Sequence, residues 1–195
     1  MIQTKDYAVD DYSKIKPIVL KNSIILDTET TGLGSTDEIC EITVIDAETA
    51  QPLINTLIKP KYSIPEEAIK IHGINNDMVS DAPDYSYIHQ HLQSIFQEKN
   101  VIIYNASFDL RMLQQSAFKY NLIPLNIHSV ICAMKWYAEY YGQWNDFRND
   151  FKWQRLGNAA RQQGIDIQDL SAHRALDDCE ITRRLIKKVN KKLRG

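Results

Sequence analysis

Three short segments rich in β-branched and other apolar residues lie close together near the start of this chain, and their spacing is the strongest constraint on its fold. They span residues 23–28, 39–46 and 53–59. Val, Ile and Thr favour extended backbone, which predicts a strand for each segment. The links between them are too short for a crossover helix, so we expect an antiparallel meander.

After Pro60 the pattern changes to an alternation of helices and strands. Apolar residues at helical spacing predict helices, and short β-branched runs between them predict further strands. We expect a short helix and loop at 64–74, helices at 84–98 and 107–120, strands at 101–104 and near 127–131, helices ending at Gly142 and Gly164, and a final helix from about 172 to 193. This order predicts an α/β domain with a mixed sheet.

The composition fits one globular domain. The chain has 195 residues, of which 44% are hydrophobic and 25% charged, a size that buries a good core. We expect an N-terminal extension over 1–22 and a single domain over 23–195. Charges interrupt the N-terminal segment where a signal peptide needs an apolar core, and no run is long enough to cross a membrane. A cytoplasmic protein without membrane contact is expected.

Charge and cysteine content exclude several classes of protein. The net charge is −2, so the molecule as a whole is not an electrostatic nucleic-acid binder, and any basic patch must be local. Cys40, Cys132 and Cys179 are odd in number, widely spaced and set among apolar residues. This pattern favours buried thiols over a disulfide framework or a zinc site.

Two carboxylates, Asp27 and Glu29, end the first predicted strand. Residues two apart in a strand point to the same face, so both side chains can converge beyond the strand's carboxyl end, where open α/β sheets tend to place ligands. Oxygen ligands suit a hard divalent ion such as Mg²⁺ or Mn²⁺. Taken alone, this pair favours a turn-capping Asp27 and a solvated Glu29 over a metal site, because short acidic motifs recur by chance.

Two further acidic residues point inward from predicted helices. A helical wheel at about 100° per residue places Asp109 at the edge of an apolar stripe and Asp178 within one. Asp177 falls instead with the basic residues Arg184 and Lys188. A carboxylate directed toward a core needs a partner, so Asp109 and Asp178 are candidate ligands in the same site as Asp27 and Glu29.

Four segments of this sequence, "DTETTGL", "HGI", "NASFD" and "HRALDDC", resemble in this order the motifs of the DnaQ-like DEDDh exonuclease superfamily. The resemblance covers residues 23 to the C-terminus, and "ICAMKWYA" with "HRALDDCEIT" is similar to the exonuclease X branch. It implies a ribonuclease-H-like fold, a mixed sheet flanked by helices, and 3′→5′ exonuclease activity with two Mg²⁺ or Mn²⁺ ions. Carried over by position, the carboxylates are Asp27, Glu29, Asp109 and Asp178, and the catalytic histidine is His173.

The implied chemistry accounts for these residue types. Two metal ions roughly 3.5–4 Å apart stabilise the attacking and leaving oxygens at phosphorus, and four carboxylates offset their charge. Imidazole, with an unperturbed pKa of about 6.5, is suited to accept a proton from water near neutral pH. The resemblance thus implies DNA 3′ ends, single-stranded or frayed, as substrate, mononucleotides as product, and a polymerase or another repair or replication protein as a possible partner.

Other matching positions are expected to hold the substrate. Thr30, Thr31 and Leu33 follow the first carboxylates, so backbone N–H groups could reach the terminal nucleotide while Leu33 packs on a base; the alternative is an ordinary turn. His72 and Asn105 match family positions near the substrate, with a loop-stabilising role for His72 equally compatible. Tyr104 departs from the family, in which many members have histidine before the asparagine.

Several alternatives stay open at this point. An RNA-directed exonuclease of the same superfamily and a non-catalytic nucleic-acid or polymerase partner module share the fold, although the module reading predicts lost acidic positions and none is lost. The segment 135–153 holds all three Trp residues and is either a core segment or a platform for single strands. The basic C-terminal tail is expected to be a solvated helix face.

Overall fold

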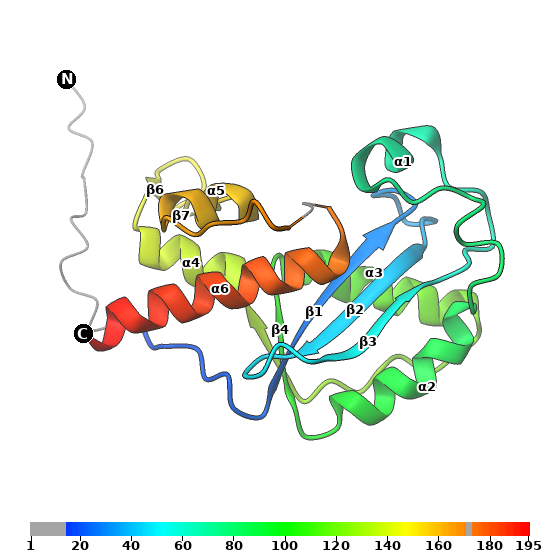
Figure 1. The fold of residues 1–195 in the computed structure, drawn as a ribbon, viewed down its shortest axis with the longest axis horizontal. Helices are drawn as coiled ribbons and strands as arrows, with labels where there is room; N and C mark the ends of the chain where they lie inside the picture. The colour runs from blue at the N-terminus through cyan, green and yellow to red at the C-terminus, as the bar shows by residue number, and fades with distance from the viewer. Residues whose placement is uncertain (1–14, 171–172) are drawn as a thin grey trace.

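A mixed five-stranded sheet forms the centre of the computed structural model, which describes residues 15–170 and 173–195. The strands are β1 (Ser23–Thr30), β2 (Ile39–Asp46), β3 (Pro52–Leu57), β4 (Asn100–Ile103) and β5 (Ser129–Cys132), in the order β3-β2-β1-β4-β5. β1 is antiparallel to β2 and parallel to β4, and β2 is antiparallel to β3. The predicted meander and the mixed sheet are therefore confirmed (Figure 1).

Six helices and a small hairpin complete the described part of the chain. They are α1 (Glu66–His72), α2 (Tyr85–Phe96), α3 (Ala106–Lys119), α4 (Ala133–Tyr141), the hairpin strands β6 (Trp144–Asn145) and β7 (Asp150–Phe151), α5 (Leu156–Gln162) and α6 (Ala175–Arg194). The hairpin was not predicted. The final helix begins at Ala175 rather than near residue 172, which lies outside the described residues.

Alternation along β1 assigns its side chains to two cores. Ile24 and Leu26 pack with residues of α2 and α3 on one face. Ile25 packs with Cys179 and Ile186 of α6 on the other face, where α6 crosses the sheet in Figure 1. Because side chains alternate with a period of two, Asp27 and Glu29 lie on the same face of β1 as Ile25, which is the face covered by α6.

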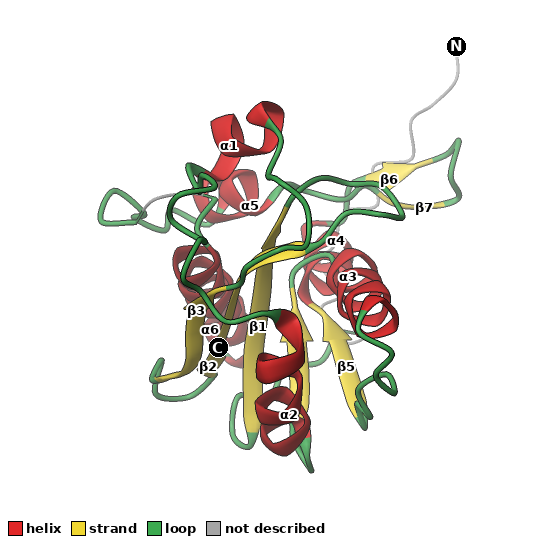
Figure 2. Cartoon of the chain, turned by 90° about the vertical axis from the view of Figure 1, so that its right-hand side faces the viewer, coloured by secondary structure: helices red, strands yellow, loops and turns green. Residues whose placement is uncertain are grey.

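The C-terminal half of α6 packs against α4 and α5 rather than against the sheet alone. Tyr137 and Tyr140 of α4 are buried with Leu185 and Val189 of α6, so these two aromatics belong to the core. In Figure 2 the hairpin and α5 both lie beyond the upper end of the sheet, and the hairpin projects away from the core. Its tip residue Phe147 is 98% exposed.

Residues 15–22, the described part of the predicted extension, lie along α6 and α4. Ile18 is buried, and its N–H and C=O both bond the Asn190 side chain, at 3.0 and 2.7 Å. The indole N–H of Trp136 donates to the Lys16 carbonyl at 2.9 Å. A domain boundary after residue 22 stays a prediction, but the residues just before it take part in the packing.

Two smaller predictions can also be compared with the structure. All three cysteines are free, with Cys40 and Cys179 buried and Cys132 only partly so, and burial raises the pKa of the Cys179 thiol well above its usual range. Within 15–170 and 173–195, every helix is too short or too polar to span a bilayer.

Candidate active site

Three of the predicted carboxylates meet at the carboxyl end of β1. Asp27 and Glu29 continue the row of Ile25 toward α6, and Asp178 lies in the first turn of that helix. Each of the three offers an oxygen atom within 4.8 Å of those of the other two. Residues 149 or more positions apart in the sequence are thus brought to one point because α6 crosses the strand that carries the first pair.

The fourth carboxylate, Asp109, enters from the first turn of α3. It is 3% exposed, and its Oδ1 accepts a hydrogen bond from the Thr28 hydroxyl at 2.7 Å. Asp109 is also the first of the neighbouring charges that raise the pKa of Asp27, after burial itself. The structure therefore brings together all four acidic residues that the motifs predicted.

Burial and mutual repulsion raise the pKa values of these carboxylates. Burial, followed by the charges of Asp178, Glu41 and Asp109, raises the pKa of Glu29 to about 8. Burial is also the largest cause of the raised pKa values of Asp27, Asp109 and Asp178. Oxygen donors with unbalanced negative charge are the ligands that hard divalent cations prefer. The residues thus fit a divalent metal centre, in which these four side chains would hold the metal.

This electrostatic arrangement predicts how the metal-free protein responds to pH. Because the pKa of Glu29 rises from 4.5 to about 8 on folding, the native state binds more protons than the unfolded state between these values. The free energy of unfolding should therefore fall as pH rises from about 4.5 to 8, by roughly a few kcal/mol. Urea denaturation in chelator measures this, and Glu29→Gln should show a clearly smaller fall. Equal pH dependence in both proteins would contradict the assignment.

His173 lies beside the carboxylates at the start of the segment that leads into α6. It is exposed, with φ +66°, and its backbone N–H and its charge both lower the pKa of Asp178, opposing the larger effect of burial. His173, Asp178 and Asn105 line one cavity of about 580 Å³. The predicted base is therefore placed next to the predicted metal ligands, on the solvent side.

A partly buried ion pair between Glu41 and Arg174, of which the motifs included only the arginine, holds this segment in place. Glu41 of β2, paired directly with Glu29 in the sheet register, is 3% exposed. Its carboxylate accepts hydrogen bonds from the Arg174 guanidinium and, at 3.0 Å, from the Ala175 backbone N–H. The start of α6, and with it Asp178, is thus fixed to the sheet. The available signal was the one charged residue in the interior of β2, since a buried carboxylate requires a partner.

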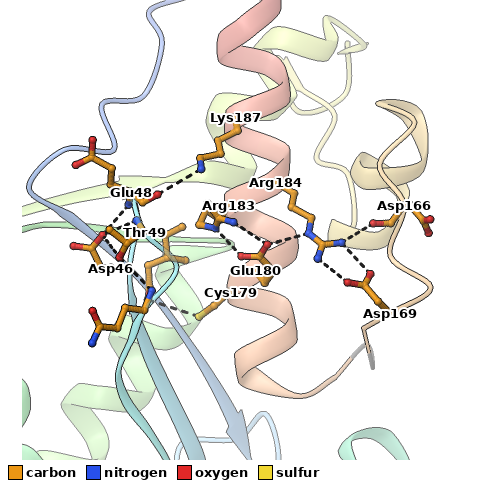
Figure 3. A network of polar contacts seen from close by, with 12 residues as sticks. Asp46, Glu48, Thr49, Asp166, Asp169, Cys179, Glu180, Arg183, Arg184 and Lys187 are labelled. Atoms are coloured by element: carbon orange, nitrogen blue, oxygen red, sulfur yellow. Dashed lines mark hydrogen bonds and ion pairs between the residues drawn. The ribbon is translucent and has the colours of Figure 1, made fainter.

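A second set of contacts anchors the loop before His173 from the other side of α6. Figure 3 shows Arg184 between Glu180 and the loop at 166–169. Its guanidinium donates to Asp169 at 2.7 and 2.9 Å and to the Asp166 carbonyl at 2.9 Å. Since Asp169 is largely exposed, this pair orients the loop more than it stabilises the protein.

The loop after β1 uses its threonines to fix its own turn. Thr30 Oγ1 donates to the Gly32 carbonyl at 2.9 Å, and Thr31 Oγ1 donates to Asp37 at 3.0 Å. A Cβ at Gly32 would lie 2.6 Å from the Asp37 carboxylate, so a larger residue there would displace this carboxylate from its bonds to Thr31 and Gly34. Leu33 is 78% exposed, which leaves its side chain available to a ligand.

His72 lies beneath this loop. The Ile74 N–H donates to Nδ1 at 3.0 Å, so Nε2 carries the ring proton and donates to the Thr30 carbonyl at 3.2 Å. Burial lowers the pKa of His72, in keeping with this neutral ring, and the residue is 5% exposed. These contacts are those of a loop-stabilising residue, and direct substrate contact by His72 stays a prediction.

Asn105 and Tyr104 connect the site to α5. Asn105 takes a left-handed conformation, φ +65°, immediately before α3, and it lines the cavity with His173. The Tyr104 hydroxyl donates to the Gln154 carbonyl at 2.8 Å. The residue that departs from the family therefore ties β4 to the segment before α5, and the four carboxylates are arranged as predicted despite the departure.

Comparison with known proteins identifies relatives of the whole fold. The exonuclease family model RNase_T matches residues 24–186. An uncharacterized exonuclease of Escherichia phage 186 is 44% identical over 169 residues, which cover 84% of this chain and 85% of the relative. DNA polymerase III subunit epsilon of Buchnera aphidicola is 37% identical over 101 residues, covering 47% of this chain and 43% of that protein.

A solved structure shows the same architecture. Exonuclease X in complex with 5′ overhanging duplex DNA superposes with a TM-score of 0.63 at 28% identity, covering 86% of this chain and 91% of that chain. The mixed sheet and its flanking helices are thus of the ribonuclease-H-like type, as expected from the motifs.

Proposed function

The chain belongs to the RNase_T exonuclease family, within the DnaQ-like DEDDh superfamily, and on that premise we propose that it hydrolyses DNA from the 3′ end and releases mononucleotides. The observation that carries the proposal is the convergence of Asp27, Glu29 and Asp178 within 4.8 Å, with Asp109 beside them. Single-stranded or frayed ends fit the open site best, because the cavity beside the carboxylates is open to solvent through exposed His173.

The four carboxylates would hold two Mg²⁺ or Mn²⁺ ions, which when bound would supply positive charge at the phosphate and lower the pKa of water. His173 accepts the proton from the attacking water as its oxygen bonds to phosphorus. The bond from phosphorus to the 3′ oxygen of the preceding nucleotide breaks, and that oxygen is protonated from solvent. Neither nucleotide is oxidised or reduced.

The remaining residues of the site orient the terminal nucleotide. Exposed Leu33 packs on its base. Because the Thr31 N–H already donates to the Glu38 carbonyl at 2.8 Å, Thr30 and Thr31 act by shaping the loop that faces the sugar and phosphate. His72 keeps that loop in position through its bond to the Thr30 carbonyl. Asn105, which lines the same cavity as His173, contacts the strand.

DNA is the proposed substrate because a relative that is 28% identical was solved with duplex DNA and another is named as a DNA polymerase subunit. The second relative supports a polymerase as partner. Because this chain spans only 43% of that relative's length, we propose such a partner rather than infer it from the relative alone. Matched DNA and RNA oligonucleotides separate this activity from RNA degradation. A cytoplasmic location stays a prediction.

The direct test uses an oligonucleotide with one end labelled and the other blocked. With Mg²⁺ or Mn²⁺ we expect stepwise shortening and mononucleotide release from a free 3′ end, complete loss of activity in excess chelator, and protection by a 3′ block. Activity that persists in chelator, or that a 5′ block abolishes while a 3′ block does not, would contradict the proposal.

A further inference from the structure

The cavity at the candidate active site extends well beyond the carboxylates. From His173 and Asp178 it continues to Trp153 and Arg155, in the segment between the hairpin and α5, and to Arg161 of α5. Its volume of about 580 Å³ exceeds what the reacting phosphate needs. The proposed reaction uses only the end that holds His173, Asp178 and Asn105, so the part near α5 has no assigned role.

The walls of this second part combine apolar and aromatic surface. Met134, Leu156 and Ile181 also line the cavity, and Ile181 is 1% exposed, so the apolar floor belongs to the core. Trp153 forms the outer edge and is 46% exposed, with the Arg148 guanidinium 5.3 Å from its ring centre. An exposed indole above an apolar floor suits a flat aromatic ligand such as a nucleobase.

The same wall carries positive charge that the protein does not neutralise. Arg155 and Arg161 are exposed, and neither side chain has a hydrogen bond or ion pair with any residue of 15–170 and 173–195. The chain as a whole has a net charge of −2, so cations here are a local feature. Free guanidinium groups beside an aromatic surface match the phosphates and bases of a nucleic-acid strand.

We propose that Trp153, Arg155 and Arg161 bind the strand that is being degraded, upstream of its terminal nucleotide. This inference rests on the proposed function and goes beyond it by naming where the rest of the substrate lies. A strand whose terminal phosphate is at Asp178 must leave the carboxylates across an adjoining surface. The continuous cavity offers one, with Arg155 and Arg161 on phosphates and Trp153 on a base.

The hairpin extends this surface away from the core. Phe147 at its tip is 98% exposed, and Arg148 links the tip to Trp153. In Figure 2 the hairpin projects above α3 and α4, away from the sheet. Of the two readings of segment 135–153, the α4 half is core and the half after Gly142 contributes to the strand surface.

Substrates of two lengths test this surface separately from the catalytic centre. The double variant Arg155→Gln with Arg161→Gln should raise KM for a long single strand about tenfold or more, with kcat unchanged. Hydrolysis of a dinucleotide with the same 3′ residue, which is too short to reach the surface, should be unaffected. In chelator, the magnitude of the slope of log affinity against log salt concentration should decrease by about 1.4. Each lost phosphate contact accounts for about 0.7 of this change, and the double variant removes two. Trp153→Ala should weaken binding roughly 5- to 150-fold.

The matched control removes two exposed cations elsewhere. Lys188→Gln with Lys191→Gln changes the net charge equally on the outer side of α6, and it should leave the salt slope at the wild-type value. An equal loss in this control, an equal loss on the dinucleotide, or unchanged long-strand binding in the arginine variant would each overturn the inference. The last result is also the one expected of a surface for another protein. If the wild type hydrolyses neither substrate, the proposed function fails, and the inference fails with it.

Discussion

Asp178→Asn should lower the rate of mononucleotide release by about three orders of magnitude, whereas Asp177→Asn should stay within a few-fold of the wild type. Asp178 offers a carboxylate oxygen within 4.8 Å of those of Asp27 and Glu29. An amide at this position would remove one negative ligand from the proposed metal centre. Such a centre stabilises the reaction by several kcal/mol, and each 1.36 kcal/mol corresponds to a factor of ten in rate.

Asp177 is the matched control because it is the same residue type, one position away on the same helix turn. Its side chain is half-buried rather than fully solvated as the helical wheel suggests, and its charge raises the pKa of Arg174 after the larger effects of Glu41. Its removal leaves the Glu41 contacts of Arg174 intact. Calorimetric titration with Mn²⁺ should show weakened binding for Asp178→Asn only. An inactive Asp177→Asn with a normal Asp178→Asn would show that the fourth carboxylate is wrongly assigned.

The register of the two site elements could be predicted because both depend on regular periods. Asp27 and Glu29 follow Ile25 at a spacing of two, and Asp178 precedes Cys179 in a helix whose apolar stripe covers the sheet. Since strand alternation and helical periodicity are set by local backbone geometry, they predict which face each carboxylate takes. The family motifs then link elements that are distant in the sequence.

What could not be predicted depends on contacts between distant segments. The Glu41–Arg174 pair joins residues 133 positions apart, and no period relates them. The hairpin has only two residues in each strand, too few for an alternation to be recognised among its aromatic residues. The same limit applies to Ile18, whose backbone bonds the side chain of Asn190, 172 positions away. Local patterns therefore predicted the face on which the carboxylates converge, while the contacts that position it required the tertiary structure.

Replacing His173 should reduce the rate strongly while leaving metal binding intact. His173→Gly is the best variant, because φ is +66°, a left-handed value that glycine adopts without strain and alanine does not. Loss of a positioned base costs about 10²- to 10⁴-fold in rate. The four carboxylates and the backbone N–H that bonds Asp178 are retained, so the Mn²⁺ dissociation constant should change little.

Added imidazole distinguishes a lost base from a distorted site. His173 is exposed on the wall of an open cavity, so removing its ring leaves space that imidazole from solution can enter. Partial recovery of His173→Gly with increasing imidazole, without recovery of Asp178→Asn under the same conditions, is expected if the ring accepts the proton of the attacking water. If His173→Gly instead loses metal binding as Asp178→Asn does, and imidazole restores nothing, His173 acts by holding the start of α6 and the base lies elsewhere.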